Sequence, residues 1–342
     1  PESIEDVVLG ATQQRGELGG NVARCVALMA GLPLATAGTT VNRLCGSSLQ
    51  ALAQAAHAIQ AGAVDVQVVG GVEHMHHLPM EAAIDIHPRV LARSSRGMLS
   101  MGLTAEQLAA SQGISRREQE EYALASHARA AAAAAAGLFD DELVPVLGHD
   151  ESGSVVDVWR DQSIRDDASL AAMAALEPAF LPKLGTVTAA TSAPLSDGAA
   201  ALVVMSQAEA GRQGLEPLAR ILATAVVGVP PAAMGTGPIV AVRKLLTRPA
   251  LAGISLSDID LVELNEAFAS QAIHCIRELD LDPARVNLRG GSLALGHPLG
   301  ASGARITTTL LHTLRDSGGR LGLATMCIGL GQGIALLFER LE

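Results

Sequence analysis

The amino-acid sequence predicts an α/β protein made of two related, layered halves. Short apolar runs of strand length alternate with helical patterns along most of the chain. The two ends also resemble each other: "IEDVVLGAT" (4–12) is similar to "SDIDLVELNEAF" (257–268). In each half a Gly/Ser-rich turn follows, opens a helix, and leads to an apolar strand that ends in glycines. We therefore expect an internal duplication with a largely parallel sheet in each half.

The turn of the first half is "LCGSSLQAL" (44–52), and that of the second is "LGASGARITTTLL" (299–311). The matching strands are "VDVQVVGGVEH" (64–74) and "RLGLATMCIGLGQG" (320–333). The halves differ in one respect, because residues 217–257 add a strand, a loop and a helix before the second repeat begins. Only a few residues precede Asp6 in the first half. We expect an opening strand and helix to be missing there, with the loss of a central strand and exposed sheet edges.

Residues 76–185 have a different character and are interpreted as an inserted loop domain. They are richer in charge and contain "SRRE", a capping box at Ser115, followed by an alanine run at 130–136 that favours a solvent-exposed helix. The predicted organisation is an N-terminal half of residues 1–75 and 186–206, the insertion 76–185, and a C-terminal half 207–342.

Composition excludes several classes of protein. Hydrophobic residues make up 49% of the chain, which provides for a large core, and the net charge is −11. No basic run or series of aromatic residues occurs, so we expect no nucleic-acid partner. No apolar stretch reaches the length of a membrane span. The four cysteines match neither a zinc motif nor a small disulfide framework, and are interpreted as reduced thiols of an intracellular protein.

Cys45 precedes the small-residue turn that opens the first repeated helix. Unpaired backbone N–H groups and the helix dipole favour a thiolate at such a position, which suits a nucleophile. Cys45 is equally consistent with a small buried residue, as most free cysteines are.

Three other stretches place reactive side chains at the ends of predicted strands or in glycine-rich turns. Asn265 ends the apolar strand of "ELNEAFAS", His297 stands between Gly296 and Pro298, and Cys327 ends a strand that is followed by glycines. Each residue alone is more often structural than functional. Functional sites of α/β proteins form at the carboxyl ends of strands, however, and the repeat would bring these turns to the same edge.

Together, "VNRLCGSS", "GGVEHM", "NEAFA", "GHPLGASGAR" and "MCIGLGQGIA" resemble the thiolase family over nearly the whole chain. The similarity is greatest to the 3-ketoacyl-CoA thiolases of bacterial fatty-acid oxidation. It implies a thiolase-like fold of two pseudo-symmetric α/β/α halves with an inserted loop domain. It also implies cleavage of 3-ketoacyl-CoA by CoA into acetyl-CoA and a shortened acyl-CoA.

The resemblance assigns roles to five residues. It implies that Cys45 carries the acyl group, with its thiolate favoured by the helix start and by His297, and that Cys327 is the general acid and base. His297 and a water held by Asn265 would stabilise one oxyanion. The backbone N–H groups of Cys45 and Gly329 would hold the other.

The resemblance implies that CoA is a substrate and that neither a cofactor nor a metal is needed. Met101 and Met234 match segments that contact pantetheine, although ordinary core packing accounts for them equally well. Ala193 stands where the family often has a CoA-contacting serine, and neighbouring Ser192 is the expected substitute. Leu330 replaces a frequent glycine and could narrow the site.

A histidine pair in "EHMHHLPM", His76 and His77, has the residue type of a metal site, but the sequence offers no evident third ligand, so a surface role is preferred. The resemblance further implies a homo-oligomer in the bacterial cytoplasm, and docking to a hydratase/dehydrogenase subunit. Two alternatives stay open: a biosynthetic acetoacetyl-CoA thiolase and a non-catalytic subunit with the same fold. Cys327 and "NEAFA" argue against a ketoacyl synthase.

Overall fold

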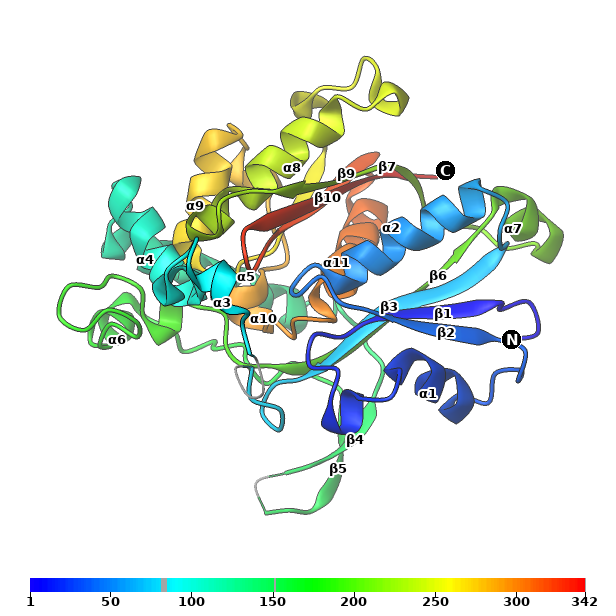
Figure 1. The fold of residues 1–342 in the computed structure, drawn as a ribbon, viewed down its shortest axis with the longest axis horizontal. Coiled ribbons are helices and arrows are strands. Elements are labelled where there is room, and N and C mark those ends of the chain that lie inside the picture. The colour runs from blue at the N-terminus through cyan, green and yellow to red at the C-terminus, as the bar shows by residue number, and fades with distance from the viewer. Residues whose placement is uncertain (81–84, 151, 342) are drawn as a thin grey trace.

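A computed structural model describes residues 1–80, 85–150 and 152–341. Two mixed sheets lie on either side of a central layer formed by two helices, α2 (Ser47–Gln60) and α11 (Ser302–Ser317), as Figure 1 shows. Helix α1 (Val22–Met29) covers the outer face of the first sheet, and α8 (Gly237–Leu246) and α9 (Ala269–Glu278) cover that of the second. The two helices predicted to open after the repeated turns are therefore the ones that pack between the sheets.

The first sheet has the strand order β2-β1-β3-β6. Strands β1 (Asp6–Gly10), β2 (Ala37–Val41) and β3 (Val66–His74) are parallel, whereas β6 (Asp197–Met205) runs antiparallel to β3. The second sheet has the order β7-β10-β9-β8, with β7 (Ala219–Gly228), β8 (Leu261–Leu264), β9 (Leu321–Ile328) and β10 (Gln332–Arg340). Here only the β8–β9 pair is parallel among the named strands.

The expectation of largely parallel sheets is confirmed for the first sheet, in which only β6 is antiparallel to its neighbour. In the second sheet β10 lies between β7 and β9 and is antiparallel to both, which leaves one parallel pair among its named strands. The glycines after Cys327 form a tight connection between β9 and β10, and a connection this short can join only antiparallel strands. Gly331 has a φ of 77°, which glycine adopts without steric cost.

The expected loss of a central strand is also wrong. In the first sheet β1 pairs on both sides, with β2 and with β3, so that the sheet is continuous. In the second sheet the extra strand β7 lies at the outer edge beside β10. The corresponding position in the first sheet is the edge beside β6.

The core between the sheets comes mainly from α2 and α11. Leu49 and Leu52 of α2 and Leu310 and Leu314 of α11 are fully buried in one apolar cluster with side chains of β9 and β10. The helices approach very closely, because a Cβ at Gly303 would lie 2.5 Å from the backbone nitrogen of Leu49. A small residue is required at this crossing.

The insertion contributes α3 (Pro88–Leu91), α4 (Met101–Ser111), α5 (Arg116–Ala135), α6 (Leu170–Ala174) and a hairpin of β4 (Val146–His149) and β5 (Val155–Val158). The capping box of Ser115 and Glu118 at the start of α5 is confirmed. The alanine run is not simply exposed, however, since Ala130 and Ala133 are buried against α10 (Ser292–Leu295) and its surroundings. Alanine permits close contact here and leaves α5 half buried.

The remaining elements are short. They are α7 (Gln207–Gln213) and 3-10 turns at Gly16–Leu18, Arg96–Leu99, Ala189–Thr191, Pro231–Thr236, Pro249–Leu251, Leu256–Asp258 and Pro283–Arg285. None of the helices among the described residues is long and apolar enough to cross a membrane.

Candidate functional site

A strained turn presents Cys45 at the start of α2. Leu44 has a φ of 46°, a left-handed conformation that is uncommon for a bulky residue and costs about 1–3 kcal/mol. Three hydrogen bonds hold it. The Asn42 side chain accepts from the Leu44 N–H at 2.9 Å, and the Ser47 hydroxyl accepts from the Arg43 N–H and donates to the Leu44 carbonyl. The sequence gives no signal for this strain.

The backbone N–H groups of Gly329 and of Cys45 itself are directed at the Cys45 sulfur. Gly329 lies just after β9, where a Cβ would be 3.1 Å from a Leu44 methyl carbon and 3.6 Å from the Met101 sulfur. Three segments therefore meet at this point: the β9–β10 hairpin of the second half, the turn that presents Cys45 in the first half, and helix α4 of the insertion.

The environment of Cys45 does not favour a resting thiolate. The pKa of the Cys45 thiol is raised to about 11, mainly by burial and to a smaller extent by nearby Glu73. The N–H groups of Gly329 and Cys45 lower it, but by less than burial raises it. The N–H groups of the helix start thus act on the pKa in the expected direction, and desolvation exceeds their effect. A neighbouring base must remove the proton when the sulfur reacts.

His297 is arranged to be such a base. Its Nδ1 lies 2.5 Å from the Ser302 hydroxyl, which itself donates to the Pro298 carbonyl at 2.8 Å. Ser302 therefore accepts from Nδ1–H, and Nε2 carries the lone pair. Burial and, to a smaller extent, the positive charge of Arg305 lower the pKa of His297 to about 3. His297 is neutral at physiological pH.

Asn265 follows β8 and lies beside His297, with 3.4 Å between its Nδ2 and the His297 Nε2. Its Oδ1 accepts from the Ser292 hydroxyl at 2.6 Å, which turns the amide nitrogen toward the imidazole. Arg305 Nη2 in turn donates to Ser292 at 2.7 Å. The sequence analysis did not identify Ser292 and Ser302, although each lies five residues from His297.

Cys327 is the last residue but one of β9 and is buried in a cluster that also contains Met101, Met234 and Phe268. Burial raises the pKa of the Cys327 thiol well above its ordinary value, and the charge of Cys45 raises it further. The two sulfurs therefore lie near enough for a negative charge on Cys45 to raise the pKa of Cys327. Both methionines lie beside Cys327, in positions that suit either substrate contact or core packing.

Ser192 lies at the edge of this region. Its backbone pairs with Phe268, and its hydroxyl donates to the Thr188 carbonyl at 2.8 Å. Its proton is engaged within the turn, so only its lone pairs are free for a ligand. Leu330 is 42% exposed at the β9–β10 connection, with a φ of 61°.

A buried carboxylate connects the His297 loop to the first half. Glu73 accepts hydrogen bonds from the backbone N–H groups of Gly300, at 2.8 Å, Thr12 and Gln13. The backbones are in close contact, because a Cβ at Gly71 would lie 2.0 Å from the Gly300 carbonyl oxygen. The two repeats are in this way held in one orientation around the site.

Glu266 likewise connects the insertion to the loop that carries Asn265. Its carboxylate accepts from Tyr122 and Ser126 of α5, at 3.0 and 2.7 Å, and from Asn287 at 2.8 Å. The helix of the insertion is therefore hydrogen-bonded to the loop that carries Asn265.

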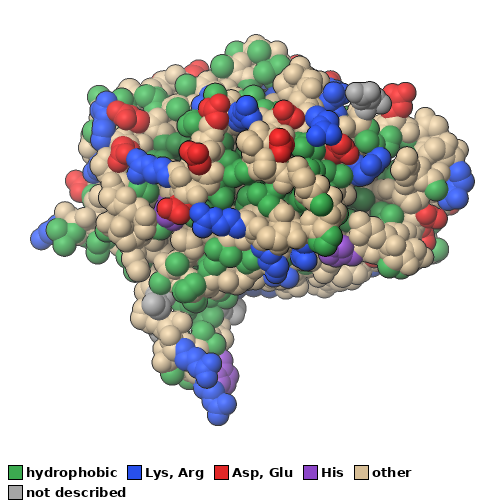
Figure 2. Space-filling model, turned by 90° about the horizontal axis from the view of Figure 1, so that it is seen from above, with side chains coloured by type: hydrophobic (Ala, Val, Ile, Leu, Met, Phe, Trp, Pro, Cys, Tyr) green, Lys and Arg blue, Asp and Glu red, His purple; other side chains and the backbone are tan. Residues whose placement is uncertain are grey.

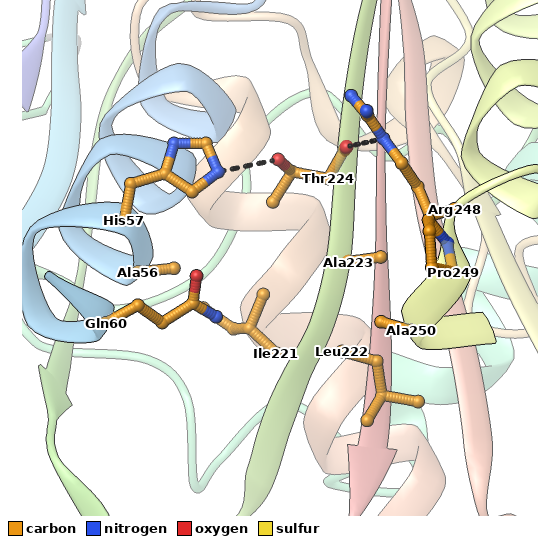
Figure 3. A pocket seen from close by; sticks show the side chains of 10 residues that line it. All are labelled: Ala56, His57, Gln60, Ile221, Leu222, Ala223, Thr224, Arg248, Pro249 and Ala250. Atoms are coloured by element: carbon orange, nitrogen blue, oxygen red, sulfur yellow. Dashed lines mark hydrogen bonds between the residues drawn. The ribbon is translucent and has the colours of Figure 1, made fainter.

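A surface cleft of about 300 Å³ lies elsewhere, between α2 and β7 (Figure 3). His57 and Thr224 face each other across it at 3.2 Å, and Arg248 donates to the Thr224 carbonyl. None of the predicted site residues lines this cleft.

Glu263, the last residue but one of β8, is expected to make the stability of the folded chain depend on pH. Burial raises the pKa of Glu263 to about 8, although Arg305 lies 3.9 Å away and opposes the shift. Between pH 4.5 and 8 the folded chain keeps a proton that the unfolded chain releases, so the free energy of unfolding falls as pH rises. Glu263→Gln cannot titrate. We expect it to unfold like the wild type near pH 4.5 and to be more stable at pH 8, by on the order of 1–4 kcal/mol.

Urea unfolding of both proteins at pH 5 and pH 8 measures this difference. Glu216→Gln, at an exposed position, is the matched control and should leave the pH slope unchanged. The same stability difference for Glu263→Gln at both pH values would show that Glu263 is not a buried neutral acid.

Comparison with known proteins agrees with this geometry. The family profile "Thiolase, N-terminal domain" matches residues 1–208, and "Thiolase, C-terminal domain" matches residues 215–340. A 3-ketoacyl-CoA thiolase of Aliivibrio fischeri is 51% identical over 99% of this chain and 88% of its own length. One from Marinomonas is 49% identical over 99% of this chain and 87% of its own length. The crystal structure of the Bacillus anthracis acetyl-CoA acetyltransferase superimposes with a TM-score of 0.89 at 40% identity, covering 99% of this chain and 88% of that one. The chain belongs to the thiolase family.

Proposed function

We propose that the protein is a 3-ketoacyl-CoA thiolase, which uses CoA to shorten a 3-ketoacyl-CoA by two carbons. The observation that carries the proposal is the pair of neighbouring thiols, Cys45 and Cys327, in a chain of the thiolase family that also holds a buried, neutral His297 beside Asn265. Relatives about half identical in sequence bear that name.

The first half-reaction forms an acyl-enzyme. His297 Nε2 takes the proton of the Cys45 thiol as the sulfur attacks the 3-keto carbon. The bond between C2 and C3 then breaks, and its electron pair forms the enolate of acetyl-CoA. The Cys327 thiol protonates C2, which releases acetyl-CoA and leaves Cys327 as a thiolate. The raised pKa of Cys327 makes this thiolate a strong base for the next step.

The second half-reaction returns the enzyme to its starting state. The Cys327 thiolate removes the proton of an incoming CoA thiol, and the CoA sulfur attacks the acyl group on Cys45. The bond from Cys45 to the acyl carbon breaks, the shortened acyl-CoA leaves, and Cys45 recovers its proton from the imidazolium of His297. Protons and electrons balance without a metal or redox partner.

Two groups of donors would stabilise the charges that develop. The backbone N–H groups of Cys45 and Gly329, which are directed at the Cys45 sulfur, would hold the oxyanion of the tetrahedral intermediates. The protonated His297 and a water on Asn265 Nδ2 would hold the enolate oxygen of the acetyl-CoA unit. Met101 and Met234, which lie beside Cys327, would contact the pantetheine, and Ser192 would accept a hydrogen bond from CoA.

A second function has its own support, because the superimposed Bacillus anthracis structure is that of an acetyl-CoA acetyltransferase. Thiolysis rates with acetoacetyl-CoA and with a long-chain 3-ketoacyl-CoA separate the two. We expect kcat/KM to be higher for the long chain. A preference for acetoacetyl-CoA would assign the second function, and no cleavage of either by the folded protein would overturn both.

Cytoplasmic location, assembly into a homo-oligomer and docking to a hydratase/dehydrogenase subunit remain predictions from the family resemblance. Size-exclusion chromatography with light scattering, alone and with such a subunit, tests the last two.

A further inference from the structure

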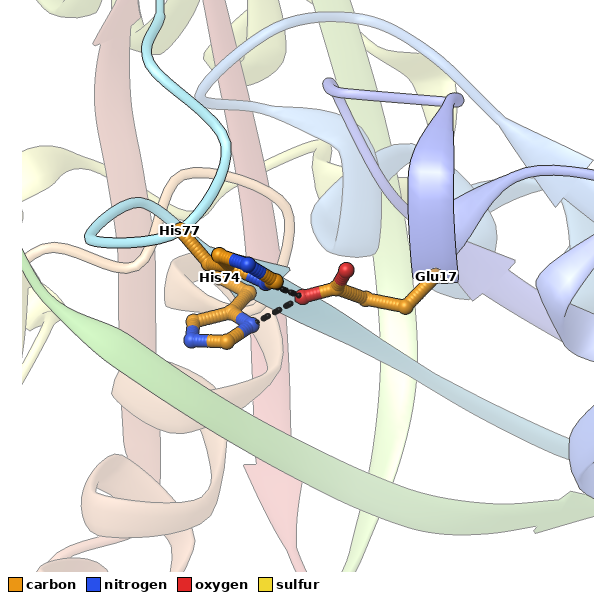
Figure 4. Close-up of side chains that lie close together, drawn as sticks. All are labelled: Glu17, His74 and His77. Atoms are coloured by element: carbon orange, nitrogen blue, oxygen red, sulfur yellow. Dashed lines mark hydrogen bonds and ion pairs between the residues drawn. The ribbon is translucent and has the colours of Figure 1, made fainter.

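Three potential metal ligands meet at the carboxyl end of β3. Glu17, from the 3-10 turn Gly16–Leu18, directs one carboxylate oxygen at Nδ1 of both His74 and His77 (Figure 4). The Oε1 of Glu17 is 2.7 Å from Nδ1 of His77, and the ligand atoms of all three residues lie within 4.8 Å of one another. The sequence had shown histidines here but no third ligand, because Glu17 is 57 residues from His74.

A second carboxylate supports these histidines from behind. Asp197, at the start of β6, has its Oδ2 3.5 Å from Nε2 of His74 and 3.1 Å from Nδ1 of His76. Its Oδ1 also accepts from the backbone N–H of His76 at 3.1 Å. Histidines that bind metals commonly donate their second ring N–H to a carboxylate in this way, which fixes the orientation of the ring.

Each ring nitrogen of His74 faces a carboxylate, Nδ1 that of Glu17 and Nε2 that of Asp197. A neutral imidazole has one N–H, so if Nδ1 donates to Glu17, the Nε2 lone pair faces the Asp197 carboxylate. A cation bound at Nδ1 removes this conflict, because the single N–H then lies on Nε2 and donates to Asp197. A second proton on the ring would also remove it, and the experiment distinguishes these two cases.

The backbone around the cluster is well fixed on one side. The residue before His74 is Glu73, whose buried carboxylate is bonded to Thr12, Gln13 and Gly300. His74 itself is the last residue of β3 and is paired with Asp197 of β6. The ligands thus come from three segments that a bound ion would tie together: the 3-10 turn, the end of β3 and the loop that follows it.

We propose that Glu17, His74 and His77 form a binding site for Zn²⁺ or a cation of the same class. Two imidazole nitrogens and one carboxylate oxygen are the ligand types that zinc prefers, and three protein ligands leave a fourth position for water. The side chains of Glu17 and His74 are 42% and 38% exposed, so the ion can enter directly from solvent. Hydrogen bonds from His77 and His74 lower the pKa of Glu17, which keeps this ligand ionised.

The site is tested with the full chain, freed of metal by a chelator and titrated with ZnCl₂ in a calorimeter. Titration with Co²⁺ reports the ligand type, because cysteine ligands add strong thiolate-to-cobalt absorption in the near ultraviolet. We expect one ion per chain, no thiolate band, and a Tm that rises with zinc concentration.

Variants identify the ligands. Glu17→Ala and His77→Ala should each abolish stoichiometric binding and the zinc-dependent rise in Tm, while Asp197→Asn should weaken binding by about 10–100-fold. His57→Ala removes an exposed histidine elsewhere and should bind zinc like the wild type. Thiolysis activity and circular dichroism show that each variant is folded. No zinc binding at micromolar concentrations, a thiolate band, or unchanged binding in both ligand variants would overturn the proposal and leave a protonated His74 as the explanation of the cluster.

Discussion

Cys45→Ala is expected to abolish acyl transfer while the protein stays folded. When a 3-ketoacyl-CoA is added without free CoA, the wild-type chain should gain the mass of one acyl group, mapped to the peptide that contains Cys45. Addition of CoA should release it. Because the proposed mechanism places the acyl group on Cys45 and uses Cys327 only to transfer protons, the variant should form no adduct. Its kcat should fall by on the order of 10⁴-fold or more, as for other enzymes that lose their nucleophile.

Cys25→Ala is the matched control. Cys25 is exposed on α1, which covers the outer face of the first sheet, and its loss should change neither the adduct nor kcat. Adduct formation by folded Cys45→Ala at the wild-type rate would show that a different residue is the nucleophile. The absence of an adduct on the wild-type chain with several ketoacyl-CoA lengths would contradict covalent catalysis.

Much of the fold could be predicted because the two repeats have strong patterns. Helices α2 and α11 begin at Ser47 and Ser302, within the predicted turns, and β3 and β9 cover the two long apolar runs. Strand direction was harder to predict. An apolar strand has the same pattern whether its neighbour is parallel or antiparallel, and only the short glycine connection after Cys327 determines that β10 returns beside β9.

The sequence identifies candidate reactive residues but not their surroundings. Hydrogen-bond partners such as Ser302 and Ser292 carry no pattern that distinguishes them from other serines of a helix start. The protonation of Cys45 depends on how much solvent the folded chain removes from the sulfur, which is a property of three segments that meet in space. Glu17 and His74 are brought together by the same kind of long-range contact.

His297→Asn is expected to make acylation depend directly on pH. In the proposed mechanism the neutral imidazole of the wild type takes the proton from the Cys45 thiol during attack. The pKa of His297 is about 3, so the base is fully available from pH 6 upward and the single-turnover acylation rate should be nearly flat between pH 7 and 9. Without the base, only the fraction already ionised reacts. Since the pKa of Cys45 is about 11, that fraction rises about 100-fold between pH 7 and 9.

The size of the loss at pH 7 follows from the same argument. Removal of a general base typically costs about 10²–10⁴ in rate, and the asparagine cannot restore it because an amide does not accept the thiol proton. Rapid quenching followed by intact-mass measurement gives the acylation rate at each pH, with His57→Asn as the control histidine variant.

Ser302→Ala distinguishes the base from its support. It keeps the imidazole but removes the acceptor that holds the proton on Nδ1. We expect an intermediate loss in rate and a pH profile that stays flat, because His297 remains the base. A steep pH profile in Ser302→Ala would place the base elsewhere in the network. A flat profile in His297→Asn would show that Cys45 is ionised before it reacts. The helix start and the N–H groups of Gly329 and Cys45 would then outweigh the effect of burial on the pKa of Cys45.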